Sequence, residues 1–232
     1  MEKELQKDNL SIPYFKGISS ILNAERTSTP LIIFSPLDMP FYKIFKRFTD
    51  IILSSIIIIT ILSWMIPLLG ILIMLDSRGP VFFLQKRNKK NGTLFTCIKF
   101  RSMILNKESD LLPADINDKR ITRIGKFMRE HYLDELPQFF NVLIGDMSVV
   151  GPRPHMISEN LKFEEQIKYY YYRHKVKPGI TGLAQVTGYA GPLTDFTKIK
   201  HRVNMDIFYV RHWSFKLDMI ILVRTVYRVL GF

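Results

Sequence analysis

The sequence is short of cysteine, because Cys97 is the only one in 232 residues. A single cysteine excludes an internal disulfide and a cysteine-rich zinc site, and it suits a reducing compartment such as the cytoplasm. Residues 1–30 are polar and mixed in charge, so they contain no secretory signal peptide. Internal repeats and low-complexity tracts are also absent. The length then predicts one catalytic or binding domain with a short appendage.

Acidic residues are scarce as well. The 21 Asp and Glu residues face 33 Lys and Arg, which gives a net charge of +12 and a pI near 9.7. This excess favours polyanionic partners: nucleic acid, an anionic lipid surface or a phosphorylated substrate. Composition alone does not choose among them. The apolar residues are concentrated in one block, and that block indicates the cellular class.

Charge is absent from Ile51 to Leu75, a run of 25 residues that forms a helix of about 37 Å, long enough to cross a bilayer core. Pro67 lacks an N–H and clashes with the carbonyl of Ser63, so we expect a break there, with the Ser63 hydroxyl satisfying part of the broken ladder. Positive residues, which normally stay cytoplasmic, flank the block on both sides: Lys43, Lys46 and Arg47 before it, and Arg78, Lys86, Arg87, Lys89 and Lys90 after it. We therefore predict a re-entrant helix hairpin, and an ordinary span with a tolerated proline stays open.

The rest of the pattern predicts a mainly helical α+β protein. Residues 1–40 read as a weakly structured lead, residues 41–78 as an amphipathic approach plus the membrane hairpin, and residues 79–232 as a cytosolic catalytic domain. Two strands joined through Asn91-Gly92 form a small β-hairpin. Further expected elements are a polar connection at 104–120, helices at 121–133 and 158–173, and an amphipathic helix at 208–230 that lies on the membrane interface or in the core.

Two adjacent acids, Asp134 and Glu135, precede a helical pattern of apolar residues that runs to Ile144, with Gly145 as its stop. Pro137 is acceptable only in the first helical turn, which places Asp134 at or near the N-cap. An acid at this position is often just a cap. The alternative is that one acid is a nucleophile and its neighbour binds a divalent cation.

Basic and glycine-bearing segments supply what phosphate chemistry needs. The residues are Arg129, close before the acids; Lys99 and Arg101 in CIKFRSM; Arg153 between two prolines; and Lys177 and Thr181 in the turn KPGITG. Each of these, taken singly, is more often a solvated charge or an ordinary turn. Their joint occurrence with an acid pair and a membrane block favours a binding site.

Several of these stretches together resemble a known family, the bacterial sugar transferases, or monotopic phosphoglycosyl transferases. The matching stretches are KRFTD, GPVFFLQKR, IKFRSM, TRIGKFMRE, LDELPQFFNVLIGDMSVVGPRPH and RHKVKPGITGLAQVTG, in this order between Phe41 and Phe232. The resemblance implies a monotopic membrane protein with a re-entrant helix hairpin. It also implies that Asp134 is the nucleophile, that Glu135 helps to hold Mg²⁺, and that Arg129 binds phosphate.

The reaction that the resemblance implies starts with attack of Asp134 on the β-phosphate of a UDP-sugar. UMP leaves, and undecaprenyl phosphate then takes the phosphosugar as the first lipid-linked intermediate of a surface glycan. The resemblance implies a location at the cytoplasmic face of the bacterial inner membrane. It also implies downstream glycosyltransferases as partners, a possible homodimer, and no binding of nucleic acid. The subgroup resembled most transfers glucose 1-phosphate for exopolysaccharide assembly.

Three departures from the family pattern stand out. Ile66 precedes Pro67 where many relatives have serine, and Leu183 replaces a tryptophan in the GITGW motif. Long members also carry several N-terminal spans and an extra domain, for which residues 1–40 are too short, so we expect a minimal catalytic form. Lys177, where many relatives have arginine, belongs to the resemblance to the glucose 1-phosphate subgroup. Two rival hypotheses stay open: a non-enzymatic basic protein of the membrane surface, with its acids serving only as caps, and a metal-dependent lipid-diphosphate hydrolase.

Overall fold

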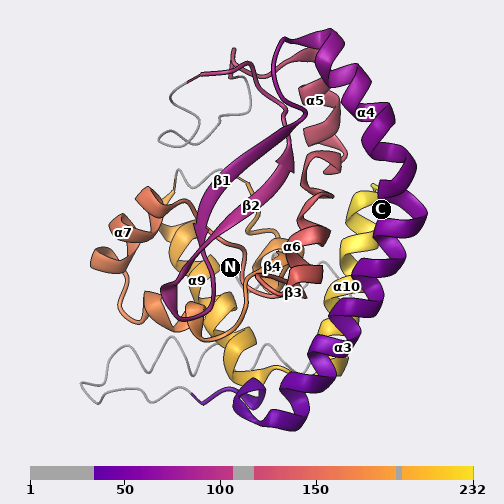
Figure 1. Ribbon diagram of the computed structural model, residues 1–232. Helices are drawn as coiled ribbons and strands as arrows, with labels where there is room; N and C mark the ends of the chain where they lie inside the picture. The colour runs from indigo at the N-terminus through magenta and orange to yellow at the C-terminus, as the bar shows by residue number, and fades with distance from the viewer. Residues whose placement is uncertain (1–33, 107–117, 192–194, 232) are drawn as a thin grey trace. The chain divides into compact units, whose positions relative to one another are not determined.

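The computed structural model describes residues 34–106, 118–191 and 195–231, which belong to one compact unit, residues 33–232. The predictions for most of the N-terminal lead and of the polar connection fall outside the described residues. The unit is mostly helical, as predicted (Figure 1). Its α-helices are α3 (Pro40–Ile57), α4 (Ser63–Asp76), α5 (Arg123–Glu130), α6 (Gln138–Ile144), α7 (Ile157–Gln166), α8 (Leu183–Val186), α9 (Phe196–His212) and α10 (Phe215–Val229).

Short helical turns and four strands connect these helices. The 3-10 turns are η2 (Pro36–Asp38), η4 (Lys90–Gly92), η5 (Leu133–Glu135) and η6 (Tyr170–Lys175), and the π-helical turn is η3 (Ile58–Leu62). The strands are β1 (Phe82–Asn88), β2 (Leu94–Phe100), β3 (Ser148–Val150) and β4 (Gly179–Thr181). They form two separate two-stranded sheets.

The apolar block differs from its prediction. Helices α3 and α4 join through the π turn η3 into one helical run, Pro40–Asp76, which among the described residues is long and apolar enough to cross a membrane. The run continues through Pro67, and the predicted reversal there is absent. The interruption lies earlier, where the Ser63 N–H bonds to the carbonyl of Ile58 instead of that of Ile59. The Ser63 hydroxyl takes up the Ile59 carbonyl at 2.7 Å, so a shift in register replaces a break.

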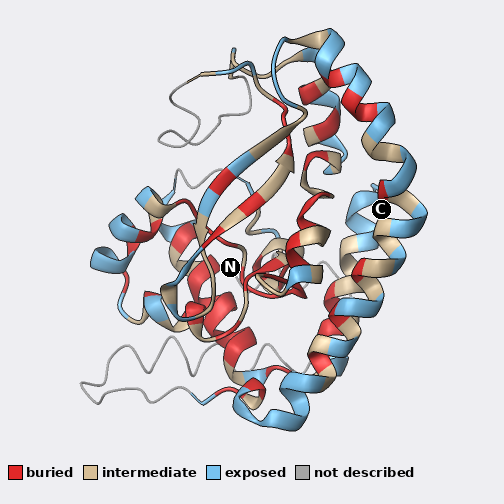
Figure 2. Cartoon of the chain, in the orientation of Figure 1, coloured by how far each residue is buried: buried red, intermediate tan, exposed pale blue. Residues whose placement is uncertain are grey.

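The two ends of this run contact the same compact unit. Helix α3 packs on α6 and β3, and α4 packs on α5. Figure 2 shows exposed residues along much of the outer side of the run, and many of these are large and apolar, such as Ile44, Ile59 and Leu75. The block therefore combines one face that binds the protein with one that is available to lipid.

The hairpin of β1 and β2 confirms the strand prediction. The strands are antiparallel, with Gln85 opposite Cys97, and the connection uses positive φ at Asn91 (60°) and Gly92 (73°). Side chains alternate along a strand, so Phe83, Gln85 and Arg87 share one face of β1. This face forms one wall of the site described below.

The second sheet was not predicted. Strands β3 and β4 are parallel and three residues long, too short for a periodic signal. Their close approach depends on glycine, because a Cβ on Gly179 would stand 2.1 Å from the backbone nitrogen of Gly151. Gly179, the first glycine of KPGITG, thus serves the packing of the two strands rather than phosphate binding.

The C-terminal prediction was partly wrong. The expected single helix over 208–230 is divided at Trp213, because the Ser214 side chain caps a new helix by accepting from the Leu217 N–H. Helix α9 is buried over most of its length. Helix α10 lies beside α3 in Figure 1 and exposes Val223, Val226 and Leu230, which is the interfacial alternative. The predicted helix 158–173 is likewise divided into α7 and η6, with Tyr169 at a positive φ of 69° between them.

Candidate active site

The acid pair lies in a 3-10 turn rather than at an α-helix cap. Helix α5 ends at Glu130, Tyr132 takes a left-handed conformation (φ 56°), and Leu133–Glu135 then form η5. The N-cap of α6 is Pro137, without a side-chain cap bond, so the prediction that Asp134 caps this helix was wrong. The predicted stop at Gly145 is confirmed, since its φ is 98°. The cap prediction failed because a proline can follow a tight turn as well as begin a helix, so Pro137 does not fix where the helix starts.

Glu135 is held by two cations. Lys99 donates to its Oε1 at 2.8 Å, and both terminal nitrogens of Arg153 donate to its two oxygens. Burial alone would raise the Glu135 pKa, but the charges and hydrogen bonds of Arg153 and Lys99 outweigh burial and hold this pKa well below its usual range. The carboxylate is therefore ionised and fixed in place, which confirms the spatial grouping of Lys99 and Arg153 with the acid pair.

Asp134 has the opposite environment. It is 8% exposed and lines a pocket of about 140 Å³ whose wall includes the hairpin face. Burial, and then the charge of Glu135, raise the pKa of Asp134 to about 6, against the lowering effects of Lys99, Arg129 and Arg153. At neutral pH the group is an ionised carboxylate in a poorly solvated place. Such a carboxylate has the chemistry of a nucleophile or a base.

Arg129 and Arg101 both line this pocket, yet they differ in what they bind. Arg129 is oriented by Ser102, whose hydroxyl accepts from its Nε at 2.8 Å, and it acts electrostatically on Asp134. Arg101 donates to the carbonyls of Arg78 and Ser77 at 2.5 and 2.6 Å, beyond the end of α4. The guanidinium of Arg101 thus secures the exit from the apolar block, a role that the sequence did not indicate.

Lys177 and Thr181 are not brought to the acid pair. The notional Cβ of Gly145 stands 3.4 Å from the Lys177 ammonium, which places this lysine beyond the C-terminal end of α6. The acids precede the other end of that seven-residue helix, about 10 Å away along its axis. Thr181 shares a hydrogen bond of 2.7 Å with Thr225 of α10. Both residues thus contact other elements, and their role in substrate binding stays a prediction.

Two groups of residues at the site were missed. Phe83, Gln85 and Arg87 line the pocket from β1, and the alternation of GPVFFLQKR would have found them once the strand was known to face a site. Arg173 is the second group: its Nη2 donates to the Arg153 carbonyl at 2.6 Å while it pairs with buried Asp206. No sequence signal indicates that contact, because it joins segments 20 and 33 residues apart in the chain.

Magnesium can be tested against the donor atoms. Among the described residues there is no group of three or more His, Cys, Asp or Glu side chains that could hold a metal ion. Glu135 does not fit the predicted role, because two cations already occupy its oxygens. Asp134 fits better, since one carboxylate plus substrate phosphates is an ordinary set of Mg²⁺ ligands.

Comparison with known proteins agrees with the residue pattern. A family model described as bacterial sugar transferase matches residues 41–231. A UDP-glucose:undecaprenyl-phosphate glucose-1-phosphate transferase of Klebsiella pneumoniae is 46% identical over 186 residues, which are 80% of this chain and 40% of that protein.

Other relatives show how the match varies in length and in substrate. An N-acetylgalactosaminephosphotransferase of Aeromonas hydrophila that acts on undecaprenyl phosphate is 44% identical over 198 residues, 84% of this chain and 46% of that protein. An exopolysaccharide production protein of Rhizobium leguminosarum bv. phaseoli is 43% identical over 188 residues, 79% of this chain and 94% of that protein. The chain thus spans about two fifths of the Klebsiella relative and nearly all of the Rhizobium one.

Proposed function

The chain belongs to the bacterial sugar transferase family, and from this premise we propose that it transfers a sugar 1-phosphate from a UDP-sugar to undecaprenyl phosphate. The observation that carries the proposal is that the two acids of the pair have different environments. Glu135 is neutralised by Lys99 and Arg153, whereas Asp134 lines the pocket with a pKa raised to about 6. A caps-only role for the acids leaves this arrangement unexplained, since neither acid caps α6.

In the first step Asp134 attacks the β-phosphorus of the donor. A bond forms between the carboxylate oxygen and phosphorus, and the bond from phosphorus to the bridging oxygen breaks, so that UMP leaves with the electron pair. In the second step a phosphate oxygen of undecaprenyl phosphate attacks the same phosphorus, and the Asp134 carboxylate is released. Covalent catalysis of this kind lets a soluble donor and a lipid acceptor use one site in turn.

The cations of the site stabilise the charge that develops on phosphorus. Arg129 lies close enough to Asp134 to lower its pKa, so it can meet the phosphate that Asp134 attacks. Glu135 acts as a positioning residue, because it holds Lys99 and Arg153 beside the reacting atoms. A pKa near 6 keeps most of Asp134 ionised at pH 7 while burial leaves the carboxylate poorly solvated.

Magnesium belongs to this proposal with a changed ligand. We expect Asp134, together with the donor phosphates, to hold it, and not Glu135. When bound, Mg²⁺ neutralises charge on the diphosphate.

Membrane attachment from one side follows from the packing of the apolar run. Because both α3 and α4 contact the same compact unit, a full crossing would carry one flank of that unit through the bilayer. The exposed apolar face of the run, with that of α10, instead fits insertion into the cytoplasmic leaflet of the inner membrane. This placement brings the pocket to the level of a lipid phosphate and keeps the monotopic prediction without a reversal at Pro67.

The sugar is proposed from the relatives. Several are named for glucose 1-phosphate transfer and one for N-acetylgalactosamine phosphate, so glucose is the first candidate. The product, a lipid diphosphate sugar, would start a surface glycan that downstream glycosyltransferases extend.

The test uses purified protein in detergent or nanodiscs with Mg²⁺, undecaprenyl phosphate and a panel of labelled UDP-sugars. UMP release and label in the lipid fraction are measured together. Transfer by the native chain and none by Asp134→Asn support the proposal. Free sugar phosphate without lipid label would favour the hydrolase, and no turnover by the native chain with any donor would overturn the proposed function.

A further inference from the structure

A partly buried arginine that lines the pocket of Asp134 has no part in the mechanism so far. Arg87 lies on the pocket-facing side of β1 and lines the same pocket as Asp134. Its Nε donates to the Gln85 side-chain oxygen at 2.9 Å, and its Nη1 donates to the Pro154 carbonyl at 2.7 Å. Gln85 is itself 5% exposed, so the guanidinium is fixed between the hairpin and the segment that carries Arg153.

The charge of Arg87 is not neutralised. Within the described part of the chain, no carboxylate lies at ion-pair distance from it, in contrast to Lys99, Arg153 and Arg173. Burial lowers the pKa of Arg87 and Arg153 adds to this lowering, whereas Cys97 and the more distant acids Glu159 and Glu135 act in the opposite direction, and the guanidinium remains protonated. A partly buried cation that is bound only by an amide oxygen and a carbonyl is stabilised when an anion binds beside it.

The sum of the charges around the pocket indicates the charge of that anion. Lys99 and Arg153 share one negative charge on Glu135, and Arg129 is bound to a neutral hydroxyl. Together with Arg87 these groups leave three positive charges. Arg101, which also lines the pocket and bonds to carbonyls, adds a fourth, and Asp134 reduces the sum to three. This excess suits an anion with more than one negative charge, such as a diphosphate.

The position of Arg87 differs from that of Arg129. Lys99, which contacts Glu135, pairs with Phe83 in the hairpin, and Arg87 is four residues further along β1, about 13 Å by the backbone. The charges that act most strongly on the pKa of Asp134 include Arg129 and Arg153 but not Arg87. Arg87 therefore lies beyond Arg153, away from the nucleophile.

We infer that Arg87 binds the leaving phosphate of the nucleotide donor, the group that departs as UMP. This inference rests on the proposed function. In phosphoryl transfer the attacking and leaving oxygens are roughly in line through phosphorus, so a cation on the far side of the pocket from Asp134 meets the leaving group. The Arg87 guanidinium has five N–H donors, and three of them bond to Gln85 and Pro154. Two donors therefore remain for a phosphate.

The experiment measures binding of UMP to the full chain in detergent by isothermal titration, with Arg87→Gln, Arg87→Lys and the control Lys86→Gln. Lys86 is the neighbouring residue on the opposite face of the same strand, and its ammonium bonds to Thr96 at the surface. We expect Arg87→Gln to raise the Kd of UMP about tenfold or more, the loss of a charge-assisted hydrogen bond. Arg87→Lys should lie in between, and Lys86→Gln should stay within about twofold.

A second readout separates the two half-reactions. With phosphosugar-loaded enzyme, transfer to added undecaprenyl phosphate should proceed at the native rate in Arg87→Gln, whereas its UMP release from donor should be slowed. Equal UMP affinity in Arg87→Gln and Lys86→Gln, or equal slowing of both half-reactions, would overturn the inference while the proposed function stands. If the native chain transfers no phosphosugar, the proposed function fails, and the inference fails with it.

Discussion

Replacement of Asp134 by asparagine should make the protein inactive and more stable. The pKa of the Asp134 carboxyl is raised from 3.8 to about 6, mainly by burial. Since the ionised form is less favourable in the folded chain than in the unfolded chain, the shift of roughly two units costs about 3 kcal/mol of folding free energy at neutral pH. Asparagine has nearly the same shape and no charge, so Asp134→Asn removes this cost.

The sign of the effect depends on pH. Well below pH 4 the carboxyl is protonated in both states, and the variant has no advantage. As the pH rises from about 4 to 6, the unfolded chain loses its proton first, so the stability of the native protein falls relative to the variant. Above pH 6 the difference stays constant.

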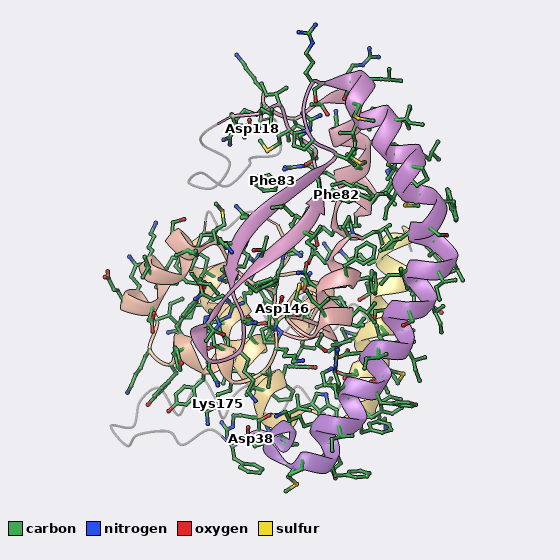
Figure 3. The ribbon with its side chains drawn as sticks, viewed as in Figure 1. Asp38, Phe82, Phe83, Asp118, Asp146 and Lys175 are labelled. Atoms are coloured by element: carbon green, nitrogen blue, oxygen red, sulfur yellow. The ribbon has the colours of Figure 1, made fainter. Side chains whose placement is uncertain are left out.

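Thermal unfolding in detergent at pH 7.5 and pH 4.5 measures this difference. For a chain of this size, about 3 kcal/mol corresponds to about 6–12 °C. We expect such a gain at pH 7.5 and a clearly smaller one at pH 4.5. Asp146→Asn is the matched control, because Asp146 is a partly exposed acid that pairs with Lys89 (Figure 3 labels it beside the lower part of the hairpin), and it should give no gain. A lower unfolding temperature for Asp134→Asn than for the native chain at pH 7.5 would refute the buried-charge reasoning.

Three further outcomes follow from the same geometry. The transfer rate should rise as Asp134 ionises, with the limb at or below about pH 6 because bound Mg²⁺ favours the carboxylate, and Glu135→Gln should move this limb to lower pH because a neighbouring negative charge is removed; an unmoved limb in the pH–rate profile would contradict the coupling. Arg153→Met should lower turnover by about a hundredfold or more, whereas Lys177→Met should keep it within about threefold, since of these two residues Arg153 alone contacts the acid pair; steady-state kinetics with comparable losses in both would show that the Lys177 placement is wrong. Asp206→Asn should lower the unfolding temperature, because it leaves a buried guanidinium unpaired, at a cost of about 3–5 kcal/mol; an unchanged temperature would show that this pair is not needed for folding.

The sequence predicted the elements that have a local signal. Helical spacing and a terminal glycine predicted the run that ends at Gly145, and Asn91-Gly92 predicted the hairpin. The acid pair and its partners Lys99, Arg129 and Arg153 were also recognised, because their residue types suit phosphate chemistry and the family pattern covers them.

The parts that were missed depend on tertiary contacts. Lys177 and Thr181 have suitable residue types, but the sequence does not contain the information that a parallel pairing of β3 and β4 turns them toward other elements. Arg101 has the residue type of a phosphate ligand, but its guanidinium bonds to carbonyls at the end of the apolar run. The sign of each charged residue could be predicted from the sequence, whereas the group with which it forms an ion pair or a hydrogen bond could not.

The apolar run illustrates the same limit for backbone geometry. A proline in a long helix leaves the carbonyl four residues earlier without its N–H donor, and a bend or a change of hydrogen-bond register nearby can accompany it. The π turn at Ile58–Leu62 is such a change of register, and the Ser63 hydroxyl bonds to the Ile59 carbonyl that the turn frees. Which of the two occurs depends on the packing of α3 and α4 against the rest of the unit, and a single sequence does not reveal that packing.

The most direct test of the central claim is whether the phosphosugar becomes bound to Asp134. The native chain is mixed with a UDP-sugar labelled at the β-phosphate, without lipid acceptor, and is quenched within a turnover. We predict that label stays with the protein, maps to the peptide containing Asp134, moves to lipid when undecaprenyl phosphate is added, and is missing in Asp134→Asn. Label that reaches the lipid without ever being bound to the protein, or undiminished labelling of Asp134→Asn, would contradict the account.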